Sequence, residues 1–139
     1  MSKKVFVDTS AWVALLNKSD QYFQDAMKVY SDLAAVKLFV SNFVVGETYT
    51  WLRYKASYDI AFSFLKSTYK KAELGQAEII YADSSLEQSA LHLLERYKDQ
   101  RISFTDALSF SIMDKLKIND AFAYDLHFSI AGFNLINKI

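Results

Sequence analysis

The sequence Lys4-Val5-Phe6-Val7-Asp8-Thr9-Ser10, at residues 4–10, decides the fold class. Its run of β-branched and aromatic residues predicts a short strand buried on both faces, which is typical of a parallel sheet. The polar residues at 8–10 are good helix caps, and the apolar residues 11–16 predict a short helix after them. A buried strand that leads directly into a helix is the beginning of a βαβ unit.

The same alternation of strands and helices continues along the chain. Further strands are expected at residues 36–40, 78–81, 121–124 and 133–136. Helices are expected at residues 20–34 with Asp20 as cap, 43–55, 56–73, 84–97 with a Ser84–Glu87 capping box, 106–117 and 126–131. Because such crossovers are right-handed and place helices on both faces, the sequence predicts one domain, residues 1–139. We expect a three-layer α/β/α sandwich with a mostly parallel central sheet.

Four acidic residues are expected to meet at one edge of this sheet. Asp8 and Asp125 directly follow predicted strands, and Glu47 and Asp106 lie early in helices that start at the same edge. Ligands of such sheets bind beyond the carboxyl ends of the strands. Each acid also has a simpler explanation when it is taken alone. Asp8 is suited to cap a helix, Asp106 to complement a helix dipole and Asp125 to stand in a turn.

Glu47 is informative because its helix face is apolar. Phe43, Val44 and Trp51 lie three or four residues away from it and share that face. A charged carboxylate among such residues needs a partner, which is either a metal ion or a base such as Arg53. We favour the metal ion because of the three companion acids.

Carboxylates gathered in one crevice would repel one another, and their pKa values would rise unless cations lay between them. Oxygen ligands suit hard cations such as Mg²⁺ or Mn²⁺. Metal-activated water would then hydrolyse a phosphodiester without a catalytic His or Cys, and the chain has no cysteine. Thr9, Ser10 and Thr105 are candidates to hydrogen-bond the carboxylates, to cap helices, or both.

The composition is that of a folded domain with an ample core. Apolar residues make up 52% of the 139 residues, and three glycines and no proline leave no evident linker. The formal net charge is zero, which disfavours a tight general nucleic-acid binder more than it disfavours an enzyme. Only three apolar residues follow Lys4 before Asp8, which is too short a segment for a signal peptide. No apolar segment of the sequence is long enough to span a bilayer. We therefore expect a soluble, cytoplasmic protein with no membrane partner.

Four segments together resemble a known family. They are Val5-Phe6-Val7-Asp8-Thr9-Ser10-Ala11-Trp12, Ser41 through Glu47, Ile102-Ser103-Phe104-Thr105-Asp106-Ala107, and Phe122-Ala123-Tyr124-Asp125-Leu126-His127-Phe128. Their order along the chain resembles that of PIN-domain ribonucleases, specifically VapC-type toxins of toxin–antitoxin pairs. The resemblance implies a PIN-like fold and Mg²⁺- or Mn²⁺-dependent endoribonuclease activity. It also implies a homodimer that is inhibited by a small cognate antitoxin.

The resemblance gives roles to individual residues. It implies that Asp8, Glu47, Asp106 and Asp125 are catalytic metal ligands. Many relatives have a histidine near Tyr22-Phe23, where this chain has aromatic residues, and we give His127 a structural or RNA-contact role.

Contacts with the substrate are less defined by the sequence. Arg53, Lys55, Lys98 and Arg101 are candidates to meet phosphates, although solvated surface charge explains each of them as well. Trp12, Tyr49 and Trp51 are candidates for base stacking, although core packing is the usual fate of aromatics at helical spacing.

Two other functions remain open. One is a PIN-like module without catalytic activity that binds RNA or protein. The other is an Asp8-nucleophile phosphatase or a phospho-receiver domain. Such a phosphatase usually has a second aspartate two residues after the first, where this chain has Ser10. A phospho-receiver domain would need an adjacent acidic pair near the first strand, which is also missing.

Overall fold

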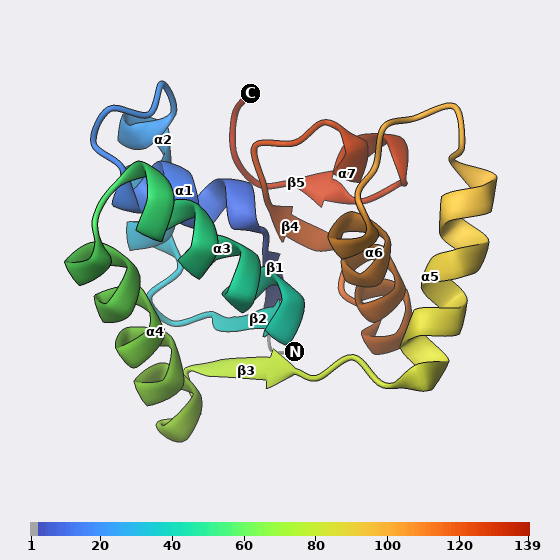
Figure 1. The fold of residues 1–139 in the computed structure, drawn as a ribbon, viewed down its shortest axis with the longest axis horizontal. Coiled ribbons are helices and arrows are strands. Elements are labelled where there is room, and N and C mark those ends of the chain that lie inside the picture. Colours follow the sequence, from blue (N-terminus) through green and yellow to red (C-terminus); the bar gives the residue numbers. More distant parts are fainter. Residues whose placement is uncertain (1–2) are drawn as a thin grey trace.

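The computed structural model describes residues 3–139, and its centre is a parallel sheet (Figure 1). The strands are β1 (Lys4–Val7), β2 (Lys37–Ser41), β3 (Ala77–Ile80), β4 (Asp120–Phe122) and β5 (Asn134–Leu135). Their order across the sheet is β3-β2-β1-β4-β5, and every neighbouring pair is parallel. The first strand therefore lies in the middle, where both of its edges are paired.

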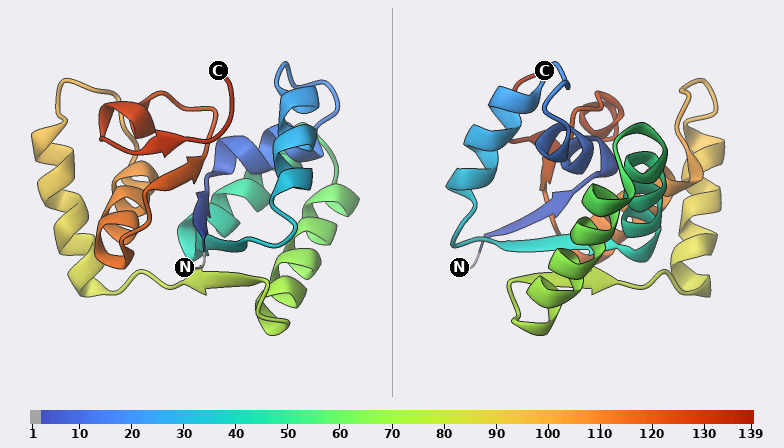
Figure 2. Two further views of the ribbon diagram at one scale, coloured as in Figure 1. Left: turned by 180° about the vertical axis from the view of Figure 1, so that it is seen from behind. Right: turned by 60° about the vertical axis from the view of Figure 1, so that its left-hand side comes forward.

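Helices cover both faces of this sheet. They are α1 (Thr9–Leu16), α2 (Phe23–Asp32), α3 (Asn42–Lys55), α4 (Tyr58–Glu73), α5 (Ser84–Arg96), α6 (Phe104–Leu116) and α7 (His127–Ile130). In Figure 1, α1–α4 gather to the left of β1 and α5–α7 to its right. The segment from β3 to α5 crosses between the two groups along the lower edge of the molecule (Figure 2). The predicted three-layer α/β/α sandwich is confirmed.

The hydrophobic core packs tightly around the central strand and α6. Val5, Phe6 and Val7 are fully buried, as the unbroken apolar run predicts for a central parallel strand. Nearly the whole surface of α6 from Thr105 to Met113 is buried, with Asp106 as the half-buried exception. Because α6 packs against α5 as well as against the core, its amino end has little freedom to move.

Two predicted helix starts are wrong in detail. The second helix begins at Phe23, because Asp20 Oδ1 accepts a hydrogen bond from the backbone N–H of Tyr22 in a turn instead of capping a helix there. The fifth helix is capped by Asp83, whose Oδ1 accepts from the N–H of Leu86 at 2.9 Å. An aspartate one residue earlier thus replaces the Ser84–Glu87 capping box.

Within residues 3–139, no helix combines the length and the hydropathy that crossing a bilayer requires.

Candidate active site

An acidic cavity of about 470 Å³ lies beyond the carboxyl ends of β1 and β4. Five carboxylates line it, which belong to Asp8, Asp20, Glu47, Asp106 and Asp125. The other lining residues are Thr9, Ser10, Val13, Gln21, Tyr22, Trp51, Ser103 and Tyr124. The structure therefore brings together the four acids expected from the sequence, and adds Asp20 to them.

Asp8 is held in place by the first turn of α1. The backbone N–H and the hydroxyl of Ser10 both donate to Asp8 Oδ2, at 3.1 and 2.6 Å. The Ser10 hydroxyl in turn accepts a hydrogen bond from the backbone N–H of Tyr124 at 2.9 Å. Asp8 is thus a helix cap, as one interpretation predicted, and it also lines the cavity. Ser10 ties the ends of β1 and β4 together around it.

Asp106 is held by a capping box that the sequence analysis missed. The N–H of Asp106 donates to the Ser103 hydroxyl at 3.0 Å, and the N–H of Ser103 donates to Asp106 Oδ2 at 3.1 Å. The Ser-x-x-Asp spacing was the available signal for this pair. Thr105, the predicted partner, is buried outside the cavity lining, and its carbonyl accepts from the Ser109 hydroxyl. Ser103 is the residue whose hydrogen bonds hold the Asp106 side chain and backbone.

Asp125 is paired with His127. The backbone N–H of His127 donates to Asp125 Oδ1 at 2.9 Å, and Nδ1 of its imidazole lies 3.0 Å from the same oxygen. Ligand atoms from Asp106, Asp125 and His127 all lie within 4.8 Å of one another, close enough to share one ion. His127 therefore stands directly at the acidic cluster, where it orients Asp125.

Glu47 does not lie among buried apolar residues as the helical spacing suggested. Val44, Val45 and Thr48 turn into the core, while Glu47 is exposed at the rim of the cavity beside Trp51. The alternative ion pair with Arg53 is also absent from residues 3–139, because the Arg53 guanidinium lies 5.7 Å above the ring of Tyr58.

The aromatic wall of the cavity was not predicted. The rings of Tyr22 and Tyr124 stack with centroids 4.5 Å apart, and the Tyr124 hydroxyl donates to Asp25 Oδ2 at 2.7 Å. Burial and the neighbouring Asp25 raise the pKa of Tyr124 above its usual value, so that this phenol stays protonated. Loop residues 20–22 carry no periodic pattern, so their place at the cavity follows from tertiary packing.

Two carboxylates in the cavity have raised pKa values. Burial raises the pKa of Asp8 to about 7, and Asp106 and Asp125 add to the shift while the Ser10 hydrogen bonds oppose it. Burial raises the pKa of Asp106 to about 6, helped by Asp125 and Glu47 and opposed by Ser103 and His127. Burial is the larger cause of both shifts, and the neighbouring carboxylates add the repulsion expected within an acidic cluster.

The donors present fit a hard divalent cation. The cluster offers mainly carboxylate oxygens, which are the ligands that Mg²⁺ and Mn²⁺ prefer. The hydroxyl of Thr9 is also buried at the cavity and has no hydrogen-bond partner within residues 3–139. Buried polar groups usually have a partner, so a ligand or water in the cavity is the natural one.

The predicted substrate-binding arginines lie elsewhere. Arg53 and Arg101 are both exposed and are not among the residues that line the acidic cavity. Their contact with a substrate larger than the cavity stays a prediction. Of the three aromatic candidates, Trp51 lines this cavity, whereas Trp12 lines a different one.

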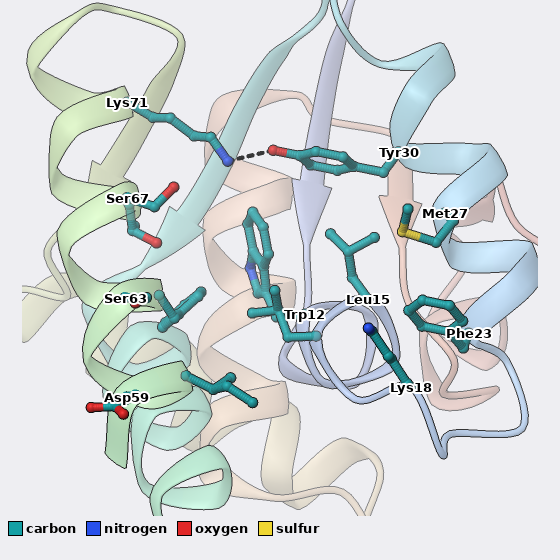
Figure 3. A pocket seen from close by; sticks show the side chains of 14 residues that line it. Trp12, Leu15, Lys18, Phe23, Met27, Tyr30, Asp59, Ser63, Ser67 and Lys71 are labelled. Atoms are coloured by element: carbon teal, nitrogen blue, oxygen red, sulfur yellow. Dashed lines mark hydrogen bonds between the residues drawn. The ribbon is translucent and has the colours of Figure 1, made fainter. Parts of the chain in front are cut away.

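That second cavity is a groove of about 690 Å³ between α1, α2 and α4. Its walls are mainly apolar, with Trp12, Leu15 and Phe23 on one side and Ile60 and Phe64 on the other. Figure 3 shows Tyr30 and Lys71 reaching toward each other across one end, where the Lys71 ammonium donates to the Tyr30 hydroxyl. The buried indole N–H of Trp12 has no partner within the described residues.

A parallel α/β/α sandwich with an acidic cluster at its carboxyl edge is the arrangement expected of a PIN domain, and a profile of the PIN domain matches residues 5–134. The chain belongs to the PIN-domain family. It is 36% identical over 129 residues to the 23S rRNA-specific endonuclease VapC20 of Mycobacterium tuberculosis, covering 93% of this chain and 95% of that protein. It is 30% identical over 128 residues to a VapC ribonuclease of Archaeoglobus fulgidus, covering 89% of this chain and 78% of the relative.

Solved structures agree with this assignment. The crystal structure of M. tuberculosis VapC20, described as a sarcin-ricin loop cleaving toxin, superposes with a TM-score of 0.85 and 32% identity over 96% of this chain and 99% of that one. The VapBC2 structure from Rickettsia felis, bound to a DNA fragment from its promoter, shares the fold with a TM-score of 0.68 and 18% identity over 95% and 96% of the two chains. The predicted PIN-domain nuclease of VapC type is confirmed.

Proposed function

We propose that the chain uses Mg²⁺ or Mn²⁺ to hydrolyse RNA internally and acts as the toxin of a type II toxin–antitoxin pair. The observation that carries this proposal is the meeting of Asp8, Glu47, Asp106 and Asp125 around one cavity. A phosphodiester is an anion and would be repelled by these acids alone, so a cation has to accompany it.

Asp8, Asp106 and Asp125 would hold the ion, with Glu47 at the rim. A bound Mg²⁺ or Mn²⁺ supplies positive charge for the phosphodiester oxygens and makes water an effective nucleophile near neutral pH. The protein orients the ligands: Ser10 fixes Asp8, Ser103 fixes Asp106, and His127 fixes Asp125. The unpaired Thr9 hydroxyl is placed to hydrogen-bond a phosphate oxygen or a water in the cavity.

The test is cleavage of RNA in EDTA, Mg²⁺ or Mn²⁺. Because a 36% identical relative is named for 23S rRNA, we propose ribosomal RNA as the substrate and would begin with intact 23S rRNA and hairpins from it. Asp8→Ala and Asp106→Asn should reduce cleavage about 100-fold or more. Asp114→Asn is the matched control, since Asp114 is an exposed acid on the same helix outside the cavity.

Cleavage that survives both chelation and these substitutions would reject the metal mechanism. RNA binding without cleavage across a broad panel would instead favour the alternative of a PIN-like binding module.

The apolar groove in Figure 3 is the proposed site of the cognate antitoxin. An amphipathic helix fits such a groove through its apolar face. Ile60 lines the groove and Phe62 does not, yet both lie on α4 with 40% and 42% exposure. Ile60→Asp should therefore abolish co-purification with a small protein encoded beside the toxin gene, whereas Phe62→Asp should not. Equal effects of the two would place the antitoxin elsewhere.

We also propose a homodimer that acts in the cytoplasm, where its RNA target and its antitoxin are made. Light scattering after size exclusion should give twice the mass of one chain. A monomer at micromolar concentration would reject the dimer without affecting the nuclease proposal.

A further inference from the structure

A shallow groove of about 460 Å³ follows the outer face of α3. Six residues line it, namely Gly46, Glu47, Thr50, Trp51, Tyr54 and Lys55. Glu47 and Trp51 also line the acidic cavity. The groove therefore adjoins the proposed site of cleavage, and α3 leads from that site along the groove.

The helix spacing aligns an acid, two aromatic rings and a base along this path. Glu47, Trp51 and Lys55 recur every four residues and share one face of α3, with Tyr54 one position before Lys55. Trp51 is half-buried and fixed against the core, whereas Tyr54 is 80% exposed. Both side chains line the groove, and within residues 3–139 neither ring packs against another aromatic ring.

Lys55 supplies positive charge at the far end of the groove. Eight residues separate it from Glu47, which corresponds to about 12 Å along a helix. Lys55 forms no ion pair within residues 3–139, so its ammonium group is available to an incoming anion. The groove thus has the acidic cavity at one end, aromatic side chains in the middle and an exposed ammonium group at the other end.

We propose that Trp51 and Tyr54 form a stacking platform for an unpaired base beside the cleaved phosphate, and that Lys55 contacts a neighbouring backbone phosphate. This inference rests on the proposed RNA substrate and narrows it to RNA that is unpaired at the cut. Base faces inside a duplex are covered by their neighbours, whereas a loop nucleotide can place its face on an aromatic ring.

The experiment measures RNA affinity separately from cleavage. A labelled hairpin with an unpaired loop and a fully paired duplex of the same length are titrated in Ca²⁺, and any cleavage is checked on a gel. Tyr54→Ala and Trp51→Ala should each weaken loop binding by about 5- to 150-fold and leave duplex binding unchanged. Tyr69→Ala is the matched control, because Tyr69 is a 51% exposed tyrosine on α4 outside both cavities.

Tryptophan fluorescence gives a second readout. The chain has two tryptophans, and Trp12 lies in the other groove, so quenching by loop RNA should come from Trp51. Trp51→Phe should remove the quenching but keep most of the affinity, since a phenyl ring still stacks. This variant also answers the concern that Trp51→Ala fails to fold.

The outcomes separate this inference from the proposed function. If the wild type cleaves RNA with Mn²⁺ while Tyr54→Ala binds loop RNA with unchanged affinity and Trp51→Phe shows unchanged quenching, the platform is wrong and the nuclease stands. If these variants change the mass in solution and not the RNA affinity, α3 is a contact between copies of the chain, which also overturns the platform. A wild type that neither binds nor cleaves any RNA overturns both proposals.

Discussion

Replacing Asp8 by asparagine should stabilise the metal-free protein at alkaline pH while it abolishes cleavage. Asp8 is 4% exposed, and its pKa is raised from 3.8 to about 7. A raised folded-state pKa means that the protonated carboxyl favours the folded chain. The contribution of the protonated Asp8 to the free energy of unfolding is complete below about pH 4 and is lost as the pH rises through about 7. Asparagine is a permanently neutral mimic that can still accept both Ser10 hydrogen bonds and cap α1.

The magnitude follows from the titration range. Between pH 5 and pH 8 the folded Asp8 loses its proton at about pH 7, whereas the unfolded chain has already lost it. About two pH units at roughly 1.4 kcal/mol each amount to about 3 kcal/mol. The free energy of unfolding of the wild type should therefore fall by about 3 kcal/mol more than that of Asp8→Asn over this range. Asp106 is present in both proteins, so its contribution to the pH dependence of the free energy of unfolding largely cancels between them.

The assay is urea unfolding of both proteins in EDTA at pH 5 and pH 8. Addition of Mn²⁺ at 100 times its dissociation constant should then stabilise the wild type by about 2.7 kcal/mol and the variant by much less. Parallel pH dependence of the two proteins in EDTA would refute the reasoning. It would mean that Asp8 is ionised in the folded chain without penalty.

Three further predictions concern single side chains. His127→Ala should raise the Mn²⁺ concentration needed for half-maximal cleavage about 10- to 100-fold, because Asp125 loses the imidazole whose Nδ1 lies 3.0 Å from its Oδ1. A titration of cleavage with Mn²⁺ checks this prediction. Phe110→Ala should cost about 3–5 kcal/mol in urea unfolding, since this ring is 1% exposed and packs edge-to-face on Phe128. Lys117→Gly should raise stability by up to about 1 kcal/mol in the same assay, because Lys117 ends α6 with φ of 58°.

The sequence by itself determined the layers and most of the acidic site. Short apolar runs indicated the strands, and the helices between them indicated a parallel sheet with crossovers on both faces. Because parallel strands end at one edge, residues that follow them in sequence have to meet there. Asp8 and Asp125 were therefore predictable as neighbours although they lie far apart in the chain.

The tertiary structure decided what the local pattern left open. Helical spacing alone does not say which face of α3 the core covers, so Glu47 came out at the rim and not among buried residues. Loop residues such as Asp20 and Tyr22 follow no period, and packing against Tyr124 brings them to the cavity. Grooves are made by side chains of several elements at once, so the apolar groove between α1, α2 and α4 could not be predicted from the sequence. Periodicity reports which residues share an element's face, and only the packed chain determines what that face meets.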